Sequence, residues 1–266
     1  MRVNGESGNL ISIRDRGLLY GDGVFRTLLV SEGQALHWPL HYQKLQHDCA
    51  ALGITCPDFA CLSAELAGLL AEHPDAVYKI IVTRGLAQRG YAPSPDSTPT
   101  PVWDVLPLPD YPASRILQGA TLQLCQLRLG HQPRLAGIKH LNRLENVLAA
   151  AECTAADEGL LLDSLGNVIE GTRSNVFLVS RGRLITPALN LCGVAGVQRD
   201  RIMDYALRIG MVVEVREVGL DELLAADEVF LSNSVFGLWP VARLEQRRWT
   251  DFKVALRLRA ALGGAS

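Results

Sequence analysis

The sequence predicts a mixed α/β (α+β) protein of two domains, and three features support this fold class. Short β-branched segments alternate with segments of helical periodicity along the chain. The 266 residues suffice for one large core or two modest ones. Prolines interrupt the pattern near the middle: four lie within 92–101 and three more within 106–112. The second proline stretch predicts an N-terminal α+β domain at 1–108, a linker at 109–114 and a C-terminal domain at 115–266.

The first half is predicted to be rich in strands. Strands over 24–30 and 34–37 flank a hairpin turn at 31–33. A helix begins at Trp38 and ends near Leu52, with Gly53 as its C-terminal cap. The remaining elements expected here are a helix over about 60–72 and strands over 77–83 and 102–106.

The second half is predicted to be antiparallel β-structure with helices packed outside. Helices are expected over 141–155 and 196–209. The expected strands lie near 121–127, 159–162, 176–179, 183–185, 212–216 and 228–231.

Composition excludes several classes of protein. The net charge of −2 gives no sign of nucleic acid or a membrane surface as a partner. No apolar run is long enough to span a bilayer, and the first ten residues lack the hydrophobic region of a signal peptide. The six cysteines form no CxxC pair and no zinc-like cluster with histidine. We therefore expect a cytoplasmic protein with reduced thiols and no metal site.

Lys139 is the first candidate for chemistry. It lies between a strand region and a helix start, flanked by Gly137, Ile138 and Leu141. Partial burial would lower the pKa of such an amine and make it nucleophilic. The alternative is a surface lysine with apolar neighbours, and the window alone favours that alternative. His140 is interpreted as a packed or exposed histidine rather than a catalyst.

Glu170 is the second candidate. Its neighbours Ile169 and Gly171 suggest a turn that lets the backbone approach a ligand. A buried carboxylate there could pair with a protonated ring nitrogen. The alternative is a solvated glutamate at a strand end.

Two further windows could bind an anion. The glycine-rich run at 192–199 leads into a helix, so the N–H groups of Val197 and Gln198 could hold a phosphate. The alternative is an ordinary glycine-rich entry to a helix. Hydroxyls in Ser232-Asn233-Ser234 could donate to the same phosphate or merely form a turn.

The glycine-rich loop at 15–25 could likewise shape a pocket or form a tight turn capped by Asp22. Among the basic residues, Arg26, Lys44, Arg84 and Arg89 could hold carboxylates or phosphate, although most such side chains only solvate a surface.

Taken together, these windows resemble the fold-type IV family of pyridoxal 5′-phosphate (PLP) enzymes, from about Asn4 to Val241. This family includes branched-chain aminotransferases, D-amino acid aminotransferases and 4-amino-4-deoxychorismate lyases. The windows that carry the resemblance are GDGVF (21–25), HYQKL (41–45), GIKHLNRLEN (137–146), VIEGTRSNVF (168–177), GVAGVQRD (193–200) and ADEVFLSNS (226–234).

The resemblance implies a role for individual residues. Lys139 matches the Schiff-base lysine, and Glu170 matches the carboxylate that faces the pyridine nitrogen. Val197 and Gln198 match the helix-start amides that bind the phosphate, and Ser234 matches a hydroxyl donor to it. Lys44 stands where the family usually has a phosphate-binding arginine, so the charge is kept but the bidentate fork is lost.

The resemblance also implies a reaction class. The stretch 135–148 and the triplet Arg89-Gly90-Tyr91 are most similar to the family's lyases, which release 4-aminobenzoate and pyruvate for folate synthesis. Arg26, Arg89 and Tyr91 are then candidate contacts for the substrate's carboxylates. The alternatives are an aminotransferase of D- or branched-chain amino acids and a non-catalytic PLP-binding protein.

The family further implies a homodimer in which PLP lies between two domains and the domain at 115–266 binds the cofactor. The expected partners are therefore a small amine-bearing carboxylate and a second copy of the chain.

Overall fold

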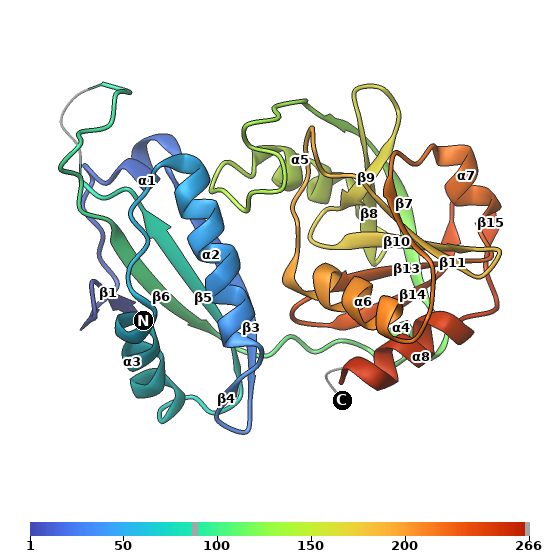
Figure 1. Cartoon of the computed structure of the whole chain (residues 1–266), viewed down its shortest axis with the longest axis horizontal. Coiled ribbons are helices and arrows are strands. Elements are labelled where there is room, and N and C mark those ends of the chain that lie inside the picture. The colour runs from blue at the N-terminus through green and yellow to red at the C-terminus, as the bar shows by residue number, and fades with distance from the viewer. Residues whose placement is uncertain (87–89, 264–266) are drawn as a thin grey trace. The chain divides into compact units, whose positions relative to one another are not determined.

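The computed structural model describes residues 1–86 and 90–263, which divide into two compact units (Figure 1). Unit 1 contains Met1–Pro109 together with Ile138–Asn142, and unit 2 contains the other described residues from Asp110 onward. The change of unit after Pro109 falls within the predicted linker 109–114. The segment Ile138–Asn142 lies within the predicted C-terminal domain, but its main chain pairs with a strand of unit 1. No helix in the described residues is both long and apolar enough to cross a membrane.

Unit 1 is built on an antiparallel sheet with the strand order β2-β1-β6-β5-β3-β4. Its strands are β1 (Arg2–Val3), β2 (Glu6–Ser7), β3 (Gly23–Ser31), β4 (Gln34–Ala35), β5 (Ala76–Thr83) and β6 (Thr100–Leu106). The predicted strands at 24–30, 77–83 and 102–106 are thereby confirmed. The strand predicted at 34–37 is shorter, because His37 turns into the left-handed conformation that begins the next helix.

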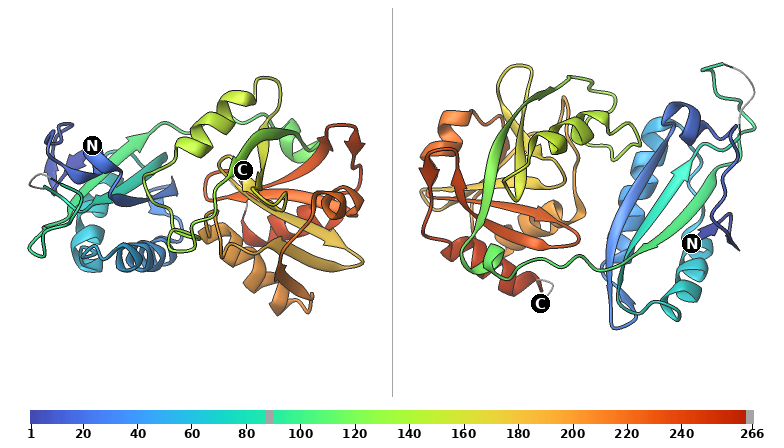
Figure 2. Two further views of the ribbon diagram at one scale, coloured as in Figure 1. Left: turned by 90° about the horizontal axis from the view of Figure 1, so that it is seen from above. Right: turned by 180° about the vertical axis from the view of Figure 1, so that it is seen from behind.

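Three helices belong to unit 1: α1 (Arg16–Tyr20), α2 (Trp38–Leu52) and α3 (Phe59–Leu70). The helix at 38–52 and its cap Gly53, at φ +64°, are as predicted. Helices α2 and α3 cover one face of this sheet (Figure 2). Side chains alternate along a strand, so every second residue of β3 and β5 faces these helices. The core between the layers consists mainly of Val24, Leu28, Val30, Leu45, Cys49, Leu62, Leu66, Leu69, Tyr78, Ile80, Val82 and Trp103.

Unit 2 contains a sheet in which β10, β13, β14, β7, β8 and β9 pair in a closed ring. Its strands are β7 (Ala120–Leu129), β8 (Glu158–Asp163), β9 (Val168–Gly171), β10 (Asn175–Ser180), β11 (Arg183–Pro187), β12 (Val213–Arg216), β13 (Glu228–Asn233), β14 (Gly237–Leu244) and β15 (Arg247–Arg248). The prediction of a purely antiparallel sheet is wrong, because β7 runs parallel to both β8 and β14, and β11 runs parallel to β12.

Helices pack on the outer face of this ring, as predicted. They are α4 (Ser114–Leu117), α5 (Leu144–Glu152), α6 (Val197–Arg208), α7 (Leu220–Ala225) and α8 (Lys253–Leu262). Helices α6 and α8 share an apolar cluster with Phe177 and Phe230 of β10 and β13. Helix α5 begins at Leu144 rather than near 141, because the preceding residues are extended against β3.

Candidate functional site

Lys139 lies in an extended segment that pairs with strand β3 of unit 1. Val24 and His140 form an antiparallel bridge, and the Lys139 carbonyl accepts a hydrogen bond from the Phe25 N–H at 2.9 Å. The Lys139 N–H donates in the other direction, to Asp48 Oδ2 of α2 at 3.0 Å. Both main-chain polar groups of Lys139 are therefore bonded, which fixes the backbone from which its amine extends.

The half-buried Lys139 side chain lies over an aromatic ring. Its Nζ is 4.6 Å from the centroid of the Phe25 ring, and Lys79 Nζ is 4.8 Å from the same centroid. Because β3 places Val24 and Leu28 against the helices, the alternation of side chains puts Phe25 on the opposite face of the sheet. Two amines therefore meet one aromatic side chain on the face opposite α2 and α3.

Arg26 has a different role from the one predicted. It precedes Thr27 and follows Phe25, so it faces α2, where its guanidinium pairs with Asp48. The side chains of this pair are 2% and 1% exposed. This corrects the prediction of Arg26 as an anchor for a substrate carboxylate, because its charge neutralises a buried carboxylate inside unit 1.

Lys44, Arg89 and Tyr91 are the remaining candidates of the N-terminal half. Lys44 is half-buried on α2, and its carbonyl accepts a hydrogen bond from Arg26 at 3.4 Å. Arg89 lies outside the described residues. Tyr91 is 84% exposed, its ring centroid lies 5.2 Å from that of Tyr20, and its carbonyl accepts a hydrogen bond from Arg16 at 2.7 Å. The predicted functions of Lys44, Arg89 and Tyr91 remain predictions.

The loop before β3 is held together by ion pairs. Asp22 Oδ2 accepts hydrogen bonds from Arg16 Nε at 2.7 Å and from Arg84 Nε at 2.8 Å. Burial by itself raises the pKa of Asp22, but the hydrogen bonds and charges of Arg84 and Arg16 outweigh it and lower that pKa below its usual value. The cap predicted for Asp22 belongs instead to Asp15, which accepts from the Gly17 N–H at the start of α1.

Glu170 is buried in unit 2, with 3% of its surface exposed. It lies within strand β9, so the predicted turn at this position is wrong. Its Oε2 accepts a hydrogen bond from the Val194 N–H at 2.8 Å. A main-chain donor therefore orients the carboxylate.

Asn175 is a further candidate residue, which the sequence windows did not single out. In the sheet, Asn175 is paired with Glu170 on one side and with Ser232 on the other, so the three side chains share the outer face. Its Nδ2 donates to the Val194 carbonyl at 2.7 Å, and its Oδ1 accepts from the Gly196 N–H at 3.2 Å. Asn175 thus fastens the segment that enters α6 to the sheet. An asparagine at a strand start was the only signal in the sequence, and it does not identify a partner.

The start of α6 has the features of an anion site. Gly196 is the N-cap residue, and Val197 and Gln198 follow in the first turn. The first N–H groups of a helix have no acceptor within the helix. A side chain at Gly196 would collide with Asn175 Oδ1, so the close approach of this segment to the sheet requires glycine.

A hydroxyl group of β13 is also present on this face. Ser232 is 1% exposed, and its Oγ has no hydrogen-bond partner among residues 1–86 and 90–263. Ser234 is half-buried in the turn that follows β13, where Asn233 Oδ1 accepts from the N–H groups of Val235 and Phe236 at 2.9 Å. A buried hydroxyl without a partner is rare in proteins and indicates a missing ligand atom or water.

Each unit by itself contains groups of the kind that PLP requires. Unit 2 provides a buried carboxylate for a protonated ring nitrogen, helix-start amides for a phosphate and the unpartnered Ser232 hydroxyl. Unit 1 provides the half-buried amine of Lys139 on a fixed main chain. The described residues contain no cluster of three metal-binding side chains.

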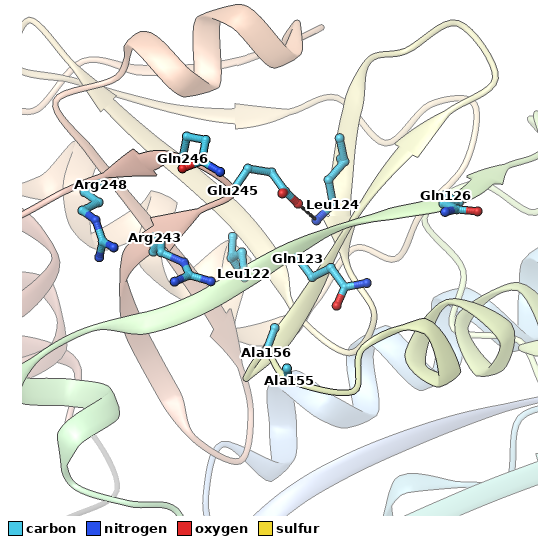
Figure 3. Close-up of a pocket in the computed structure, with 10 residues that line it drawn as sticks. All are labelled: Leu122, Gln123, Leu124, Gln126, Ala155, Ala156, Arg243, Glu245, Gln246 and Arg248. Atoms are coloured by element: carbon cyan, nitrogen blue, oxygen red, sulfur yellow. Dashed lines mark hydrogen bonds between the residues drawn. The ribbon is translucent and has the colours of Figure 1, made fainter.

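A groove of about 400 Å³ also lies in unit 2, but none of these groups lines it (Figure 3). It is lined by residues of β7 together with Arg243 and Arg248, and Glu245 accepts a hydrogen bond from the Leu124 N–H at 3.2 Å.

An amine, a carboxylate and an anion-binding helix start are the protein groups that a PLP enzyme requires. Residues 23–244 match the model of the amino-transferase class IV family. The chain belongs to this family, whose enzymes use PLP.

Particular relatives are similar over nearly the whole chain. An aminodeoxychorismate lyase of Vibrio harveyi is 36% identical over 242 residues, covering 90% of this chain and 89% of the relative. A crystal structure of 4-amino-4-deoxychorismate lyase from Pseudomonas aeruginosa is 44% identical, covers 98% of both chains and superposes with a TM-score of 0.93. A D-alanine aminotransferase of Bacillus licheniformis is 29% identical over 247 residues, or 88% of this chain and 83% of the relative.

Proposed function

We propose that this protein is a PLP-dependent lyase that converts 4-amino-4-deoxychorismate to 4-aminobenzoate and pyruvate in folate biosynthesis. The observation that carries the proposal is the similarity to the P. aeruginosa lyase over 98% of both chains. Its identity of 44% exceeds the 29% found with the D-alanine aminotransferase.

Lys139 is proposed to carry the cofactor and to move the proton. When bound, PLP supplies an electron sink for negative charge on the carbon that bears the substrate's amine. The Lys139 amine removes the proton from this ring carbon and returns it to the departing enolpyruvate, which becomes pyruvate. Its main-chain hydrogen bonds to Phe25 and Asp48 support this role, because they fix the origin of the side chain.

Glu170 is proposed to keep the pyridine nitrogen protonated. An ionised carboxylate attracts that proton, whereas a neutral group would not. The proposal is supported by the Val194 N–H, whose hydrogen bond at 2.8 Å orients the Glu170 carboxylate.

The phosphate is proposed to bind at the start of α6. Its donors would be the N–H groups of Val197 and Gln198, with hydroxyls from Ser232 and Ser234 and the charge of Lys44. The unpartnered Ser232 Oγ and the N-cap Gly196 support the part of this set that lies in unit 2. Arg89 and Tyr91 are retained as candidate contacts for the two substrate carboxylates.

Product analysis tests this function. Incubation with enzymatically generated 4-amino-4-deoxychorismate should release 4-aminobenzoate and pyruvate in equal amounts with no keto acid added. The 4-aminobenzoate is followed by fluorescence and the pyruvate by a coupled assay. The same protein should transaminate D-alanine or leucine only weakly with 2-oxoglutarate.

Efficient transamination without 4-aminobenzoate would instead establish the aminotransferase alternative. The matching family model and the D-alanine aminotransferase relative make this the second candidate. Both reactions remove the proton from the carbon that bears the substrate's amine. They differ in whether the neighbouring carbon carries a leaving group.

We also propose that the enzyme is a cytoplasmic homodimer, on the basis of its resemblance to the fold-type IV enzymes. All six cysteines are free thiols, in keeping with a reducing compartment. Light scattering of the purified protein would give its mass relative to the 29.0 kDa chain.

A further inference from the structure

The carboxylate of Asp48 is shared between a buried cation and the main chain of Lys139. Its Oδ2 accepts from the Lys139 N–H at 3.0 Å and pairs with the guanidinium of Arg26. His47, which is 72% exposed, contacts the other oxygen at 3.3 Å. A single carboxylate in the core of unit 1 therefore connects strand β3, helix α2 and the segment that carries Lys139.

The Asp48 contact lies where the pairing of this segment with β3 ends. The Leu141 N–H donates to the Gly23 carbonyl, and the Phe25 N–H donates to the Lys139 carbonyl, both at 2.9 Å. One step further back, the Lys139 N–H bonds to Asp48 rather than to β3. The carboxylate thus ends the strand pairing at the residue whose side chain lies over Phe25.

We propose that Asp48, neutralised by Arg26, is a positioning residue that sets the main chain of Lys139 and thereby the place of its amine. This inference rests on the proposed function of Lys139. Asp48 acts from the helix-covered side of the sheet, whereas the Lys139 side chain lies with Phe25 on the opposite face. Asp48 can therefore influence the amine without any contact with cofactor or substrate.

Arg26 is required in this arrangement because the carboxylate is buried. An unpaired charge in a protein core is strongly unfavourable, so removing either partner alone would destabilise unit 1 as a whole. Single substitutions would therefore mix stability with positioning, and the pair has to be replaced together.

Two double variants separate the hydrogen bond from the charge. R26M/D48L removes both charges and the acceptor for the Lys139 N–H, and apolar replacements of a buried ion pair often preserve folding. R26Q/D48N also removes both charges but keeps a side-chain oxygen that can accept from that N–H. The matched control is R115M/D157L in unit 2, where Asp157 pairs with Arg115 at 2.7 Å and accepts from the Thr121 N–H at 2.8 Å.

The readouts concern Lys139 itself. In PLP-free protein we would measure hydrogen exchange of the main-chain amides over 138–142. We would also measure the acylation rate of each lysine by mass spectrometry, with the exposed Lys253 as the reference for these rates. We would then measure how fast added PLP becomes fixable to Lys139 by borohydride. In R26M/D48L, amide exchange should accelerate and PLP attachment should slow roughly tenfold to a hundredfold. In R26Q/D48N and in the control, the rates of amide exchange and of PLP attachment should stay within about twofold of the parent. Independent substitutions commonly introduce scatter of this size.

Parent-like PLP attachment and amide exchange in folded R26M/D48L would overturn the inference. If that variant does not fold, D48E decides, because it keeps the charge but moves the carboxylate by one methylene; slower attachment supports the inference and an unchanged rate refutes it. A separate result tests the proposed function of Lys139: that function is refuted if Lys139→Ala still forms the borohydride-fixed adduct.

Discussion

The amine of Lys139 and the amine of Lys79 lie at similar distances from the Phe25 ring, so proximity alone does not choose between them. The two lysines differ in their main-chain surroundings. The Lys139 N–H bonds to Asp48 at the end of a strand pairing, whereas Lys79 lies within β5, which pairs with β3 and β6. The labelling of individual residues can therefore distinguish them.

Borohydride reduction of the yellow holoenzyme should fix PLP on Lys139. Lys139→Ala should lose both this adduct and turnover, because the amine that carries PLP is then absent. Peptide mass mapping locates the label. Lys79→Ala is the control and should keep the adduct; a label on Lys79 or Lys44 would show that the assignment is mistaken.

Glu170→Gln should fold and bind PLP but lose activity on the order of a hundredfold, because a neutral amide cannot hold the ring nitrogen protonated. The amide oxygen can still accept from the Val194 N–H, so the local structure should be preserved. Steady-state kinetics and thermal unfolding are the measurements. Near-normal turnover would mean that another group faces the ring nitrogen.

Lys44→Arg should bind PLP at least as tightly as the parent protein. A guanidinium matches a phosphate with two parallel hydrogen bonds, which is worth about 1 kcal/mol where the site can accommodate it. Lys44→Ala should weaken binding by more. Equilibrium dialysis gives the dissociation constants, and unchanged values in both variants would place Lys44 away from the phosphate.

At the level of elements, specific contacts hold the loop that enters α6 against the sheet. Asn175 bonds this segment at two points, and Gly196 leaves room for the approach. Glu170 bonds the same segment through Val194. The orientation of the first turn of α6 therefore depends on strands β9 and β10, which are distant from it in the sequence.

Asn175→Ala should lower the free energy of unfolding by about 1–3 kcal/mol and weaken PLP binding, because it leaves the Val194 carbonyl and the Gly196 N–H without their partner. Denaturant unfolding of PLP-free protein and PLP titration measure the two effects.

Asn146→Ala is the control, since Asn146 Nδ2 also donates to a main-chain carbonyl, that of Thr172 at 3.1 Å, but not in the α6 entry. It should leave PLP affinity unchanged. If Asn175→Ala lowers stability but binds PLP normally, the start of α6 does not hold the phosphate.

At the scale of the whole molecule, the ion pairs of Asp22 predict how stability depends on pH. The pKa of Asp22 is lowered in the folded protein, so its contribution is fully present above the unfolded pKa of about 4 and is lost as pH falls through the folded value. Asp22→Asn removes this contribution and should cost about 1–3 kcal/mol near neutral pH.

Melting temperatures measured between about pH 7 and pH 3 test this, because the gap between parent and variant should shrink below about pH 4. Glu6→Gln, an exposed carboxylate on β2, serves as control and should show a small gap throughout. A gap for Asp22→Asn that does not change with pH would mean that its ionisation is not linked to folding.

Much of the molecule could be predicted from local patterns. The helix at 38–52 ends at Gly53 because glycine tolerates the left-handed conformation, and alternating apolar residues indicate β3 and β5. The order of the windows around Lys139, Glu170 and Val197 likewise indicated the PLP family. Each of these features depends on residues close together in the chain, so local patterns were enough to predict it.

Local patterns did not reveal which charges and polar groups meet in the folded chain. Arg26 was predicted to face a substrate, but it pairs with Asp48 on a helix, and that carboxylate also holds the main chain of Lys139. Asn175 acquires its role from a loop that follows it by about twenty residues. Such contacts form when strands and helices far apart in sequence pack against one another, and the packing determines which side chain is buried and what it must pair with.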